Sequence, residues 1–132
     1  MRPTAPRPVL VIASGNAYKV AEISAMLDAV DLEVRQQPDG LDIEETGSTY
    51  LENARLKASA VAQLTGQWAL ADDSGLSVEA LGGIPGVHSA RYADSDSARI
   101  ERLLRELSDA GADTRETRSA CFTAALALAN PQ

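Results

Sequence analysis

Hydrophobic residues along the chain fall into two patterns, short continuous runs and stripes at helical spacing. Residues 8–13 form an unbroken apolar run, which is typical of a strand buried on both faces. After a break at residues 14–16, apolar residues recur at positions 20, 23, 27 and 30, so a first helix is expected there. Residues 32–36 alternate and predict a second strand. The chain therefore opens as strand, glycine turn, helix and strand.

A second predicted helix follows a polar acidic loop at residues 41–48. Thr49 and Glu52 stand three residues apart, which is the capping-box pattern of a helix start. Gly66 suits the end of the same helix. The remaining segments are assigned in order: a short strand at 68–71 stopped by the polar residues 72–75, a strand or helical turn at 76–81, a loop at 82–86, a helix that begins within 94–97, and a strand at 119–129.

Strands that alternate with helices predict an α/β fold with a largely parallel or mixed sheet. Residues 1–8 are expected to be a disordered tail, and residues 9–132 a single domain. A turn signal at Asn130 and Pro131 directly follows the last predicted strand, and such a strand normally has a partner beyond its turn. We therefore expect the domain to be incomplete, with its C-terminal portion missing.

The composition limits the classes of protein to which the chain can belong. Apolar residues make up 45% and aromatic residues only 4%, so the core is expected to be aliphatic. The formal net charge of −7 argues against a duplex nucleic-acid binder and against a polybasic membrane anchor. No apolar run approaches the roughly 20 residues of a membrane span. A cytoplasmic location is expected, and the single cysteine, Cys121, is predicted to be inert in the core.

Residues 14–19, with the sequence SGNAYK, connect the first predicted strand to the first predicted helix. Backbone N–H groups at a helix N-terminus attract phosphate, and Lys19 adds a positive charge one turn into the helix. The second glycine and the Gly-Lys-Ser/Thr ending of a Walker A loop are absent. The segment fits either a phosphate-binding turn or an ordinary capped helix with a solvated lysine.

Two adjacent carboxylates, Asp72 and Asp73, follow the predicted strand at residues 68–71, and α/β sheets place their active sites at such strand ends. Because consecutive side chains of a strand point to opposite faces, at most one of the two faces a cleft directly. Carboxylate oxygens suit Mg²⁺, which takes few protein ligands and adds water and substrate phosphates. The alternative is a β-turn rich in turn-forming residues.

A third polar group spans the acidic loop and the start of the second predicted helix. Glu44 and Glu45 lie in the loop and can reach a metal. Asn53 and Lys57 are four residues apart and share one helix face. The alternatives are that Glu52 only completes the capping box and that the glutamates belong to a solvated loop.

Arrangements for covalent catalysis find no support in the sequence. Position 72 is an aspartate rather than a glycine, so Ser74 does not lie in a Gly-x-Ser-x-Gly nucleophile elbow. His88 and Ser89 are chain neighbours and do not form a triad, so His88 is expected to be a surface or packing residue. The chemistry therefore rests on phosphate-binding groups and carboxylates.

Taken together, four segments resemble the inosine triphosphate pyrophosphatase family, whose members hydrolyse deaminated purine nucleoside triphosphates. The segments occur in the family's order and are highly specific as a set. They are SGNAYK at 14–19, EETGSTYLENARLKA at 44–58, ADDSGL at 71–76 and LGGIPGVHSARY at 81–92. The resemblance covers nearly the whole chain. It implies a curved mixed sheet flanked by helices, two lobes with a cleft, a homodimer and a requirement for Mg²⁺.

The resemblance also assigns roles to individual residues. Asp73 corresponds to the general base and a Mg²⁺ ligand, and Glu44 to a second ligand. Arg91 belongs to a motif that shapes either the site or a dimer contact. The substrate-binding residues are expected to be Ser14, Gly15, Asn16, Ala17, Tyr18, Lys19 and Ser74, with Glu52, Asn53, Lys57 and Asp72 as further candidates.

The expected activity is Mg²⁺-dependent hydrolysis of ITP, dITP and XTP to the nucleoside monophosphate and pyrophosphate, which removes these nucleotides from the pool. Later family motifs that grip the base have no counterpart in this sequence. One alternative is therefore a nucleotide- or metal-binding module without catalytic competence. A further alternative is a related house-cleaning pyrophosphatase that acts on pyrimidine or modified nucleotides.

Overall fold

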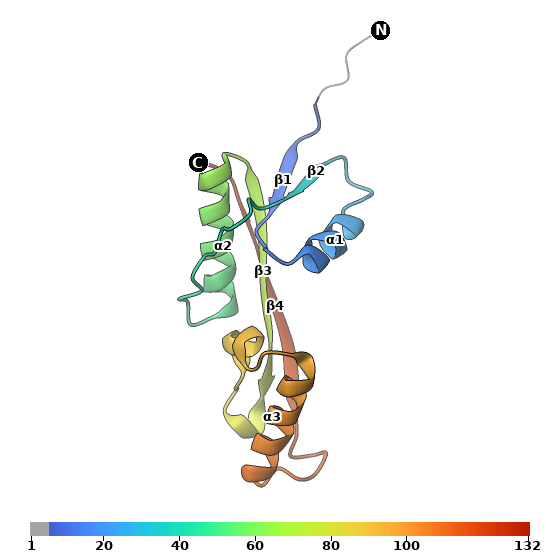
Figure 1. Cartoon of the computed structure of the whole chain (residues 1–132), viewed down its shortest axis with the longest axis vertical. Coiled ribbons are helices and arrows are strands. Elements are labelled where there is room, and N and C mark those ends of the chain that lie inside the picture. Colours follow the sequence, from blue (N-terminus) through green and yellow to red (C-terminus); the bar gives the residue numbers. More distant parts are fainter. Residues whose placement is uncertain (1–5) are drawn as a thin grey trace. The chain divides into compact units, whose positions relative to one another are not determined.

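The computed structural model describes residues 6–132, which form four strands, three α-helices and two short 3₁₀ helices. Figure 1 shows their order along the chain. The elements are β1 (Val9–Ile12), α1 (Ala17–Met26), β2 (Glu33–Gln36), α2 (Tyr50–Thr65), β3 (Trp68–Val78), η1 (Glu79–Leu81), η2 (Gly86–Arg91), α3 (Asp96–Asp109) and β4 (Ala120–Ala129).

The four strands form one mixed sheet in the order β2-β1-β3-β4. Strand β1 lies between two parallel partners, with Leu10 opposite Val34 of β2 and opposite Trp68 of β3. This central position explains why the sequence of β1 is continuously apolar rather than alternating. The predicted α/β fold with a mixed sheet flanked by helices is confirmed.

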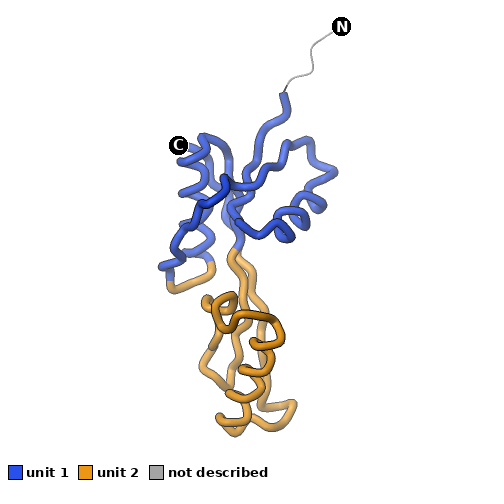
Figure 2. The backbone as a smooth tube through the Cα atoms, in the orientation of Figure 1, with its two compact units in different colours: residues 1–47, 51–72, 126–132 blue, residues 48–50, 73–125 orange. Residues whose placement is uncertain are grey.

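The chain divides into two compact units, which Figure 2 distinguishes by colour. Unit 1 contains the described residues up to 47 together with 51–72 and 126–132, and unit 2 contains residues 48–50 and 73–125. Strand β3 contributes its first five residues to unit 1 and the rest to unit 2. Each unit has its own cluster of buried apolar side chains and is described by itself.

The core of unit 1 is built from small aliphatic side chains. One face of α2 is buried at Ala54, Ala58, Val61 and Ala62, and most of this face packs with residues of β1 and β3. Alanine on this face allows close approach of the helix to the strands, which suits a chain with few aromatic residues. The cluster consists of Val11, Ala13, Ala58, Val61, Ala62, Ala69 and Ala71.

In unit 2, a buried tyrosine joins η2 to α3. The Tyr92 hydroxyl donates to Glu106 Oε2 at 2.5 Å, and the Arg102 guanidinium lies 4.1 Å from the centre of the Tyr92 ring. Burial first, and the hydrogen bond to Glu106 second, raise the pKa of Tyr92 to about 12. These contacts flank a small core of Val78, Leu107 and Ala112.

The end of α1 and residues 86–91 differ from the sequence prediction, and the structure resolves the assignment of residues 76–81, which the sequence left open between strand and helical turn. Helix α1 ends at Met26, and Val30 lies instead in a turn where its N–H donates to Leu27 O at 2.9 Å. Residues 76–81 divide into the end of β3 and the 3₁₀ helix η1. Residues 86–91, for which no element was predicted, form η2.

The polar segment 72–75 does not stop the third strand, because β3 continues through it to Val78. Packing explains the difference from the prediction. A side chain at Gly75 would place its Cβ 2.6 Å from Ser89 Oγ, so this turn-forming residue is needed for close approach of η2 to the strand. Ser89 Oγ fastens the same contact by accepting from Leu76 N–H at 3.0 Å and donating to Gly86 O at 2.6 Å.

The prediction of a buried, inert Cys121 is wrong, because this residue is exposed on β4. Strand β4 lies at an edge of the sheet, and its residues 120–124 are all exposed. Most of the tail expected at residues 1–8 falls on residues 1–5, which lie outside the described part. Within residues 6–132 no helix is long and apolar enough to cross a membrane.

Replacing Tyr92 by Phe should lower the melting temperature by several degrees, because Glu106 loses a charge-assisted hydrogen bond while the ring is kept. The hydrogen bond from Tyr92, and after it the one from Arg102, lowers the pKa of Glu106. The stabilisation of the folded state by these bonds is therefore present at neutral pH and is lost as the pH falls through that lowered pKa. Thermal unfolding at neutral pH and in acid measures both effects. Tyr18, which is 89% exposed, provides the control Tyr18→Phe. Equal melting temperatures of wild type and Tyr92→Phe at neutral pH would contradict this account.

Candidate functional site

The segment that connects β1 to α1 forms the predicted strand–turn–helix. Asn16 caps the helix, because its Oδ1 accepts from the backbone N–H of Tyr18 at 3.0 Å and of Lys19 at 3.4 Å. Ser14 Oγ accepts from the Asn16 N–H at 3.1 Å and tightens the turn. The side chains of Ser14 and Asn16 thus hold the backbone of the turn, and the positive end of the α1 dipole lies at this point.

A cavity of about 230 Å³ lies beside this turn within unit 1. It is lined by residues of the turn, the residue after β2, the acidic loop, α2 and the last unit 1 residue of β3. The lining residues are Ala13, Ser14, Gly15, Lys19, Gln37, Leu41, Asp42, Ile43, Glu45, Lys57 and Asp72. Most of the polar and charged lining residues come from the sequence segments 14–19, 44–58 and 71–76.

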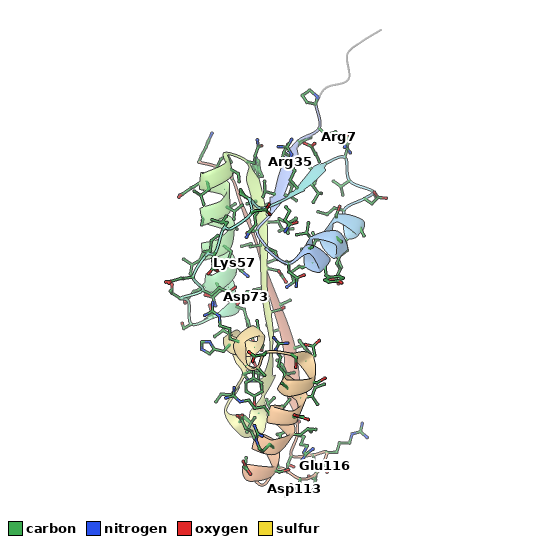
Figure 3. All side chains as sticks on the ribbon, in the orientation of Figure 1. Arg7, Arg35, Lys57, Asp73, Asp113 and Glu116 are labelled. Atoms are coloured by element: carbon green, nitrogen blue, oxygen red, sulfur yellow. The ribbon has the colours of Figure 1, made fainter. Side chains whose placement is uncertain are left out.

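Two lysines and two carboxylates pair across the cavity. Lys19 Nζ lies 2.9 Å from Asp72 Oδ2, and Lys57 Nζ lies 3.0 Å from Glu45 Oε1. Lys57, which projects from α2 (Figure 3), also donates to the backbone carbonyl of Asp72 at 2.6 Å. The side chains of Lys19 and Asp72 are 33% and 16% exposed, so water screens this pair less than an ion pair on the open surface. These are the only two lysines in the sequence.

Gln37 is a member of the cavity wall that sequence reasoning missed. It directly follows β2, its N–H donates to Ile12 O at 3.1 Å, and its side-chain Nε2 donates to Leu41 O at 3.0 Å. The largely buried amide thus ties the start of the acidic loop to the end of the strand. A polar residue at the end of a predicted strand is too common to identify such a role, so only its position at the sheet edge could have pointed to it.

The two adjacent aspartates of β3 differ in their surroundings, as the alternation of a strand requires. Asp72 lines the cavity of unit 1, whereas Asp73 is the first β3 residue of unit 2, is 7% exposed and does not line that cavity. Asp73 has interaction partners of its own. Figure 3 labels Asp73 on β3. Ser74 follows it and is partly exposed.

The other predicted site residues lie outside the wall of this cavity. Glu44 is exposed, although its neighbour Glu45 faces the cavity. Tyr18 is exposed at the start of α1, and Arg91 is exposed at the end of η2. Asn16, Ala17 and Glu52 are also exposed and do not line the cavity.

Asn53 has a structural bond that its sequence pattern did not indicate. Its side chain is almost fully buried at 1% exposure, and its Oδ1 accepts from the Gly47 N–H at 2.7 Å. A side chain at Gly47 would bring its Cβ within 2.7 Å of the same oxygen, so the glycine allows the loop to approach the helix this closely. Asn53 thereby fixes the end of the acidic loop against α2.

The carboxylates near the cavity suit a magnesium–phosphate complex better than a preformed metal cage. Among residues 6–132, no group of three or more His, Cys, Asp or Glu side chains is arranged to hold a metal ion. Mg²⁺ takes only one or two protein carboxylates when phosphate oxygens and water complete its coordination. Within unit 1, Asp42, Glu45 and Asp72 line the cavity and carry hard oxygen donors of the type used in that mode of binding.

Comparisons with known proteins all match one family. The family model described as the Ham1 family matches residues 10–132. A dITP/XTP pyrophosphatase from Synechococcus sp. (strain CC9311) is 63% identical over 123 residues, which cover 93% of this chain and 57% of that protein. A dITP/XTP pyrophosphatase from Prochlorococcus marinus (strain MIT 9313) is 62% identical over 122 residues, which cover 92% of this chain and 58% of that protein.

Solved structures agree with the sequence comparisons. The structure of a HAM1 protein from Coxiella burnetii matches with a TM-score of 0.84 at 42% identity, and the match covers 94% of this chain and 64% of that chain. The resemblance derived from the four sequence segments is confirmed. The chain spans less than two thirds of the length of each of these relatives.

Asn53→Ala should lower the free energy of unfolding by about 1–3 kcal/mol, because the Gly47 N–H loses its acceptor and the buried Asn53 side chain is removed. Gln63→Ala is the matched control, since Gln63 lies on the exposed face of the same helix and should change stability by no more than about 0.5 kcal/mol. Denaturant unfolding followed by circular dichroism measures both. A loss for Asn53→Ala as small as that of the control would show that the bond does not hold the loop.

Proposed function

Because the chain belongs to the Ham1 family, we propose that the protein hydrolyses non-standard purine nucleoside triphosphates, namely ITP, dITP and XTP, to the monophosphate and pyrophosphate. The observation that carries the proposal is the polar cavity of unit 1, where both lysines and the start of α1 meet. The relatives named dITP/XTP pyrophosphatases support the substrate class. Removal of these nucleotides from the pool is the proposed role.

The phosphate chain is held by the turn between β1 and α1. Backbone N–H groups at the start of a helix and the positive end of its dipole favour anionic oxygens. Lys19 and Lys57 add two positive charges in the same cavity. Ser14 and Asn16 keep the turn in its shape through their bonds to its backbone, so they act by positioning.

The acidic side chains of the loop and of β3 hold a divalent cation in this proposal. From the family resemblance, Glu44 and Asp73 are the ligands, and Mg²⁺ is the proposed ion. When bound, such an ion neutralises charge that develops on the leaving pyrophosphate. Carboxylates repel a polyphosphate, so a cation bound between the two removes this repulsion in a chain of net charge −7.

Asp73 is proposed as the general base. A carboxylate in this role accepts a proton from the water that attacks the α-phosphorus, and the bond from that phosphorus to the bridging oxygen of pyrophosphate breaks. Asp72, its neighbour, is engaged by Lys19 and therefore suits charge balance rather than proton transfer. Ser74 is proposed as a substrate contact. No covalent nucleophile is needed in this scheme.

Assembly and location complete the proposal. The family resemblance favours a homodimer with a purine nucleoside triphosphate as its substrate. The composition and the acidic charge favour a cytoplasmic protein that binds neither nucleic acid nor a membrane. Arg91, exposed at the end of η2, is a candidate for the dimer contact or the site.

Pyrophosphate release from ITP, dITP and XTP should exceed release from GTP and from pyrimidine triphosphates, and Asp73→Asn should reduce it by about a hundredfold or more. Asp113→Asn, an exposed aspartate of unit 2 (Figure 3), is the matched control and should leave turnover unchanged. Turnover of Asp73→Asn within about threefold of wild type would exclude Asp73 as the base. Preference for pyrimidine or modified nucleotides would favour the related house-cleaning class.

Removal of divalent cations should abolish turnover, and Mg²⁺ added in excess of the chelator should restore it, since the phosphates need a bridging charge. A titration of Mg²⁺ into chelated protein with dITP present measures this. If calorimetry detects dITP and Mg²⁺ binding but no pyrophosphate is released, the chain is a binding module. Full activity under chelation would contradict the role of the metal.

A further inference from the structure

In unit 2, the chain that follows β3 runs back alongside the last residues of that strand. Val78 N–H donates to Ile84 O at 3.2 Å, and Leu76 N–H donates to the side-chain Oγ of Ser89 at 3.0 Å. The pairing of β3 with β1 ends earlier, at Leu70. A backbone carbonyl and then a serine hydroxyl therefore act as hydrogen-bond acceptors for β3 beyond the end of its pairing with β1.

Ser89 is oriented for this role by a second hydrogen bond. Its hydroxyl donates to Gly86 O at 2.6 Å, so the single proton of the group is engaged within η2. The oxygen then presents a lone pair to the Leu76 N–H. The hydroxyl is therefore oriented by η2 as an acceptor for β3.

Gly75 lies in close contact with the side chains that face this part of β3. A Cβ at this position would lie 2.6 Å from Ser89 Oγ and 2.9 Å from Tyr50 Cε1. The Tyr50 hydroxyl, in turn, lies 3.2 Å from Ser77 Oγ, within hydrogen-bond distance. The end of β3 is thus packed tightly against Ser89 and Tyr50.

The residues held in this way directly follow a segment whose sequence favours a turn. Residues 72–75 read DDSG, and Asp, Ser and Gly are turn-forming residues. They are nevertheless part of a strand that continues to Val78. Because the local preference opposes the extended form, contacts from outside the segment hold it, and the hydrogen bond to Ser89 is one that a single side chain supplies.

The direction of the Asp73 carboxylate depends on the course of this backbone. Asp73 is 7% exposed and has interaction partners of its own, so its side chain has little freedom to compensate for a shift of the strand. A displacement of about 1 Å at a reacting group can cost about a hundredfold in rate. A contact that fixes the strand near Asp73 therefore bears on any reaction in which this carboxylate takes part.

We propose that Ser89 is a positioning residue, whose hydroxyl holds β3 at Leu76 and thereby sets the direction of the Asp73 carboxylate. The inference rests on the proposed function, in which Asp73 is the general base. It goes further by giving a role to a residue of the segment 81–92, and in it Ser89 acts through Asp73 rather than on the substrate.

The effect of Ser89 on β3 can be measured without turnover. In Ser89→Ala the Leu76 amide should exchange its hydrogen about fivefold faster or more, because it loses its acceptor. The side-chain carboxyl signal of Asp73 should shift in the same variant. Nuclear magnetic resonance of labelled protein measures both changes. An unchanged exchange rate at Leu76, or an unchanged Asp73 signal, would overturn the proposal.

Ser89→Thr provides a rescue, because it keeps the hydroxyl. Its added methyl group can enter the apolar cavity of about 170 Å³ in unit 2 that Ser89 lines together with Leu76 and Tyr92. This variant should therefore retain the slow exchange of Leu76 and the Asp73 signal of wild type. Changes as large as those of Ser89→Ala would show that the hydroxyl is not what holds the strand.

The kinetic effect should fall on kcat rather than on KM. With dITP as substrate, Ser89→Ala should lower kcat by about tenfold or more while KM stays within about twofold, because the phosphate-binding lysines are unchanged. In an Asp73→Asn background the same substitution should have little further effect, since a residue that acts through Asp73 has nothing left to position. A serine that only stabilises the fold would lower kcat by the same factor in both backgrounds, and that result would contradict the proposal.

Ser108→Ala is the matched control, because Ser108 is an exposed serine of α3 in the same unit. It should leave the Asp73 signal, the exchange at Leu76 and kcat as in wild type. Circular dichroism verifies that each variant is folded. Ser89→Cys, whose thiol is only a weak acceptor, replaces Ser89→Ala if that variant unfolds.

The outcome is separable from that of the proposed function. If the wild-type chain releases no pyrophosphate from ITP, dITP or XTP, the proposed activity fails, while coupled changes at Leu76 and Asp73 in Ser89→Ala would still uphold the hold of Ser89 on the carboxylate. Hydrolysis by wild type that Ser89→Ala leaves unchanged would uphold the activity and overturn the role of Ser89.

Discussion

Charge balance inside a partly buried cavity is the constraint on which the candidate site depends. Two ammonium groups and two carboxylates approach within about hydrogen-bond distance in unit 1, and each is too shielded from water to be left alone. Desolvation of these four groups is tolerated because each has an opposite partner. The two ion pairs therefore connect α1, α2, the acidic loop and β3 around one cavity.

The backbone of β3 places this network. The strand alternation directs Asp72 to the cavity, while Asp73, one residue later, belongs to unit 2 and is buried. Gly75 and Ser89 hold the continuation of the strand against η2, so the polar segment remains extended although its residues favour a turn. The position of the Asp72 carboxylate in the cavity therefore depends on the contacts that Gly75 and Leu76 of the same strand make with η2.

Local sequence patterns predicted those elements whose form is decided locally. The apolar run of β1, the capping residue Ser95 of α3 and the glycine after α2 all carry their signals within a few residues. The strand through residues 72–75 and the exposure of Cys121 were predicted wrongly, because packing against η2 and a position at the sheet edge decide them. These contacts join residues far apart in sequence, so no local periodicity contains them.

The same limit applies to the candidate site. The sequence identified Lys19, Lys57 and Asp72 as polar residues in notable segments, but not that one partners the next, since 53 residues separate Lys19 from Asp72. Gln37 escaped notice because a polar residue at the end of a strand is too common to indicate a place in a cavity wall. The family resemblance supplied what residue patterns could not, namely which segments act together. It did not supply the pairing of each lysine with a carboxylate, which brings residues of α1, α2, the acidic loop and β3 together around one cavity.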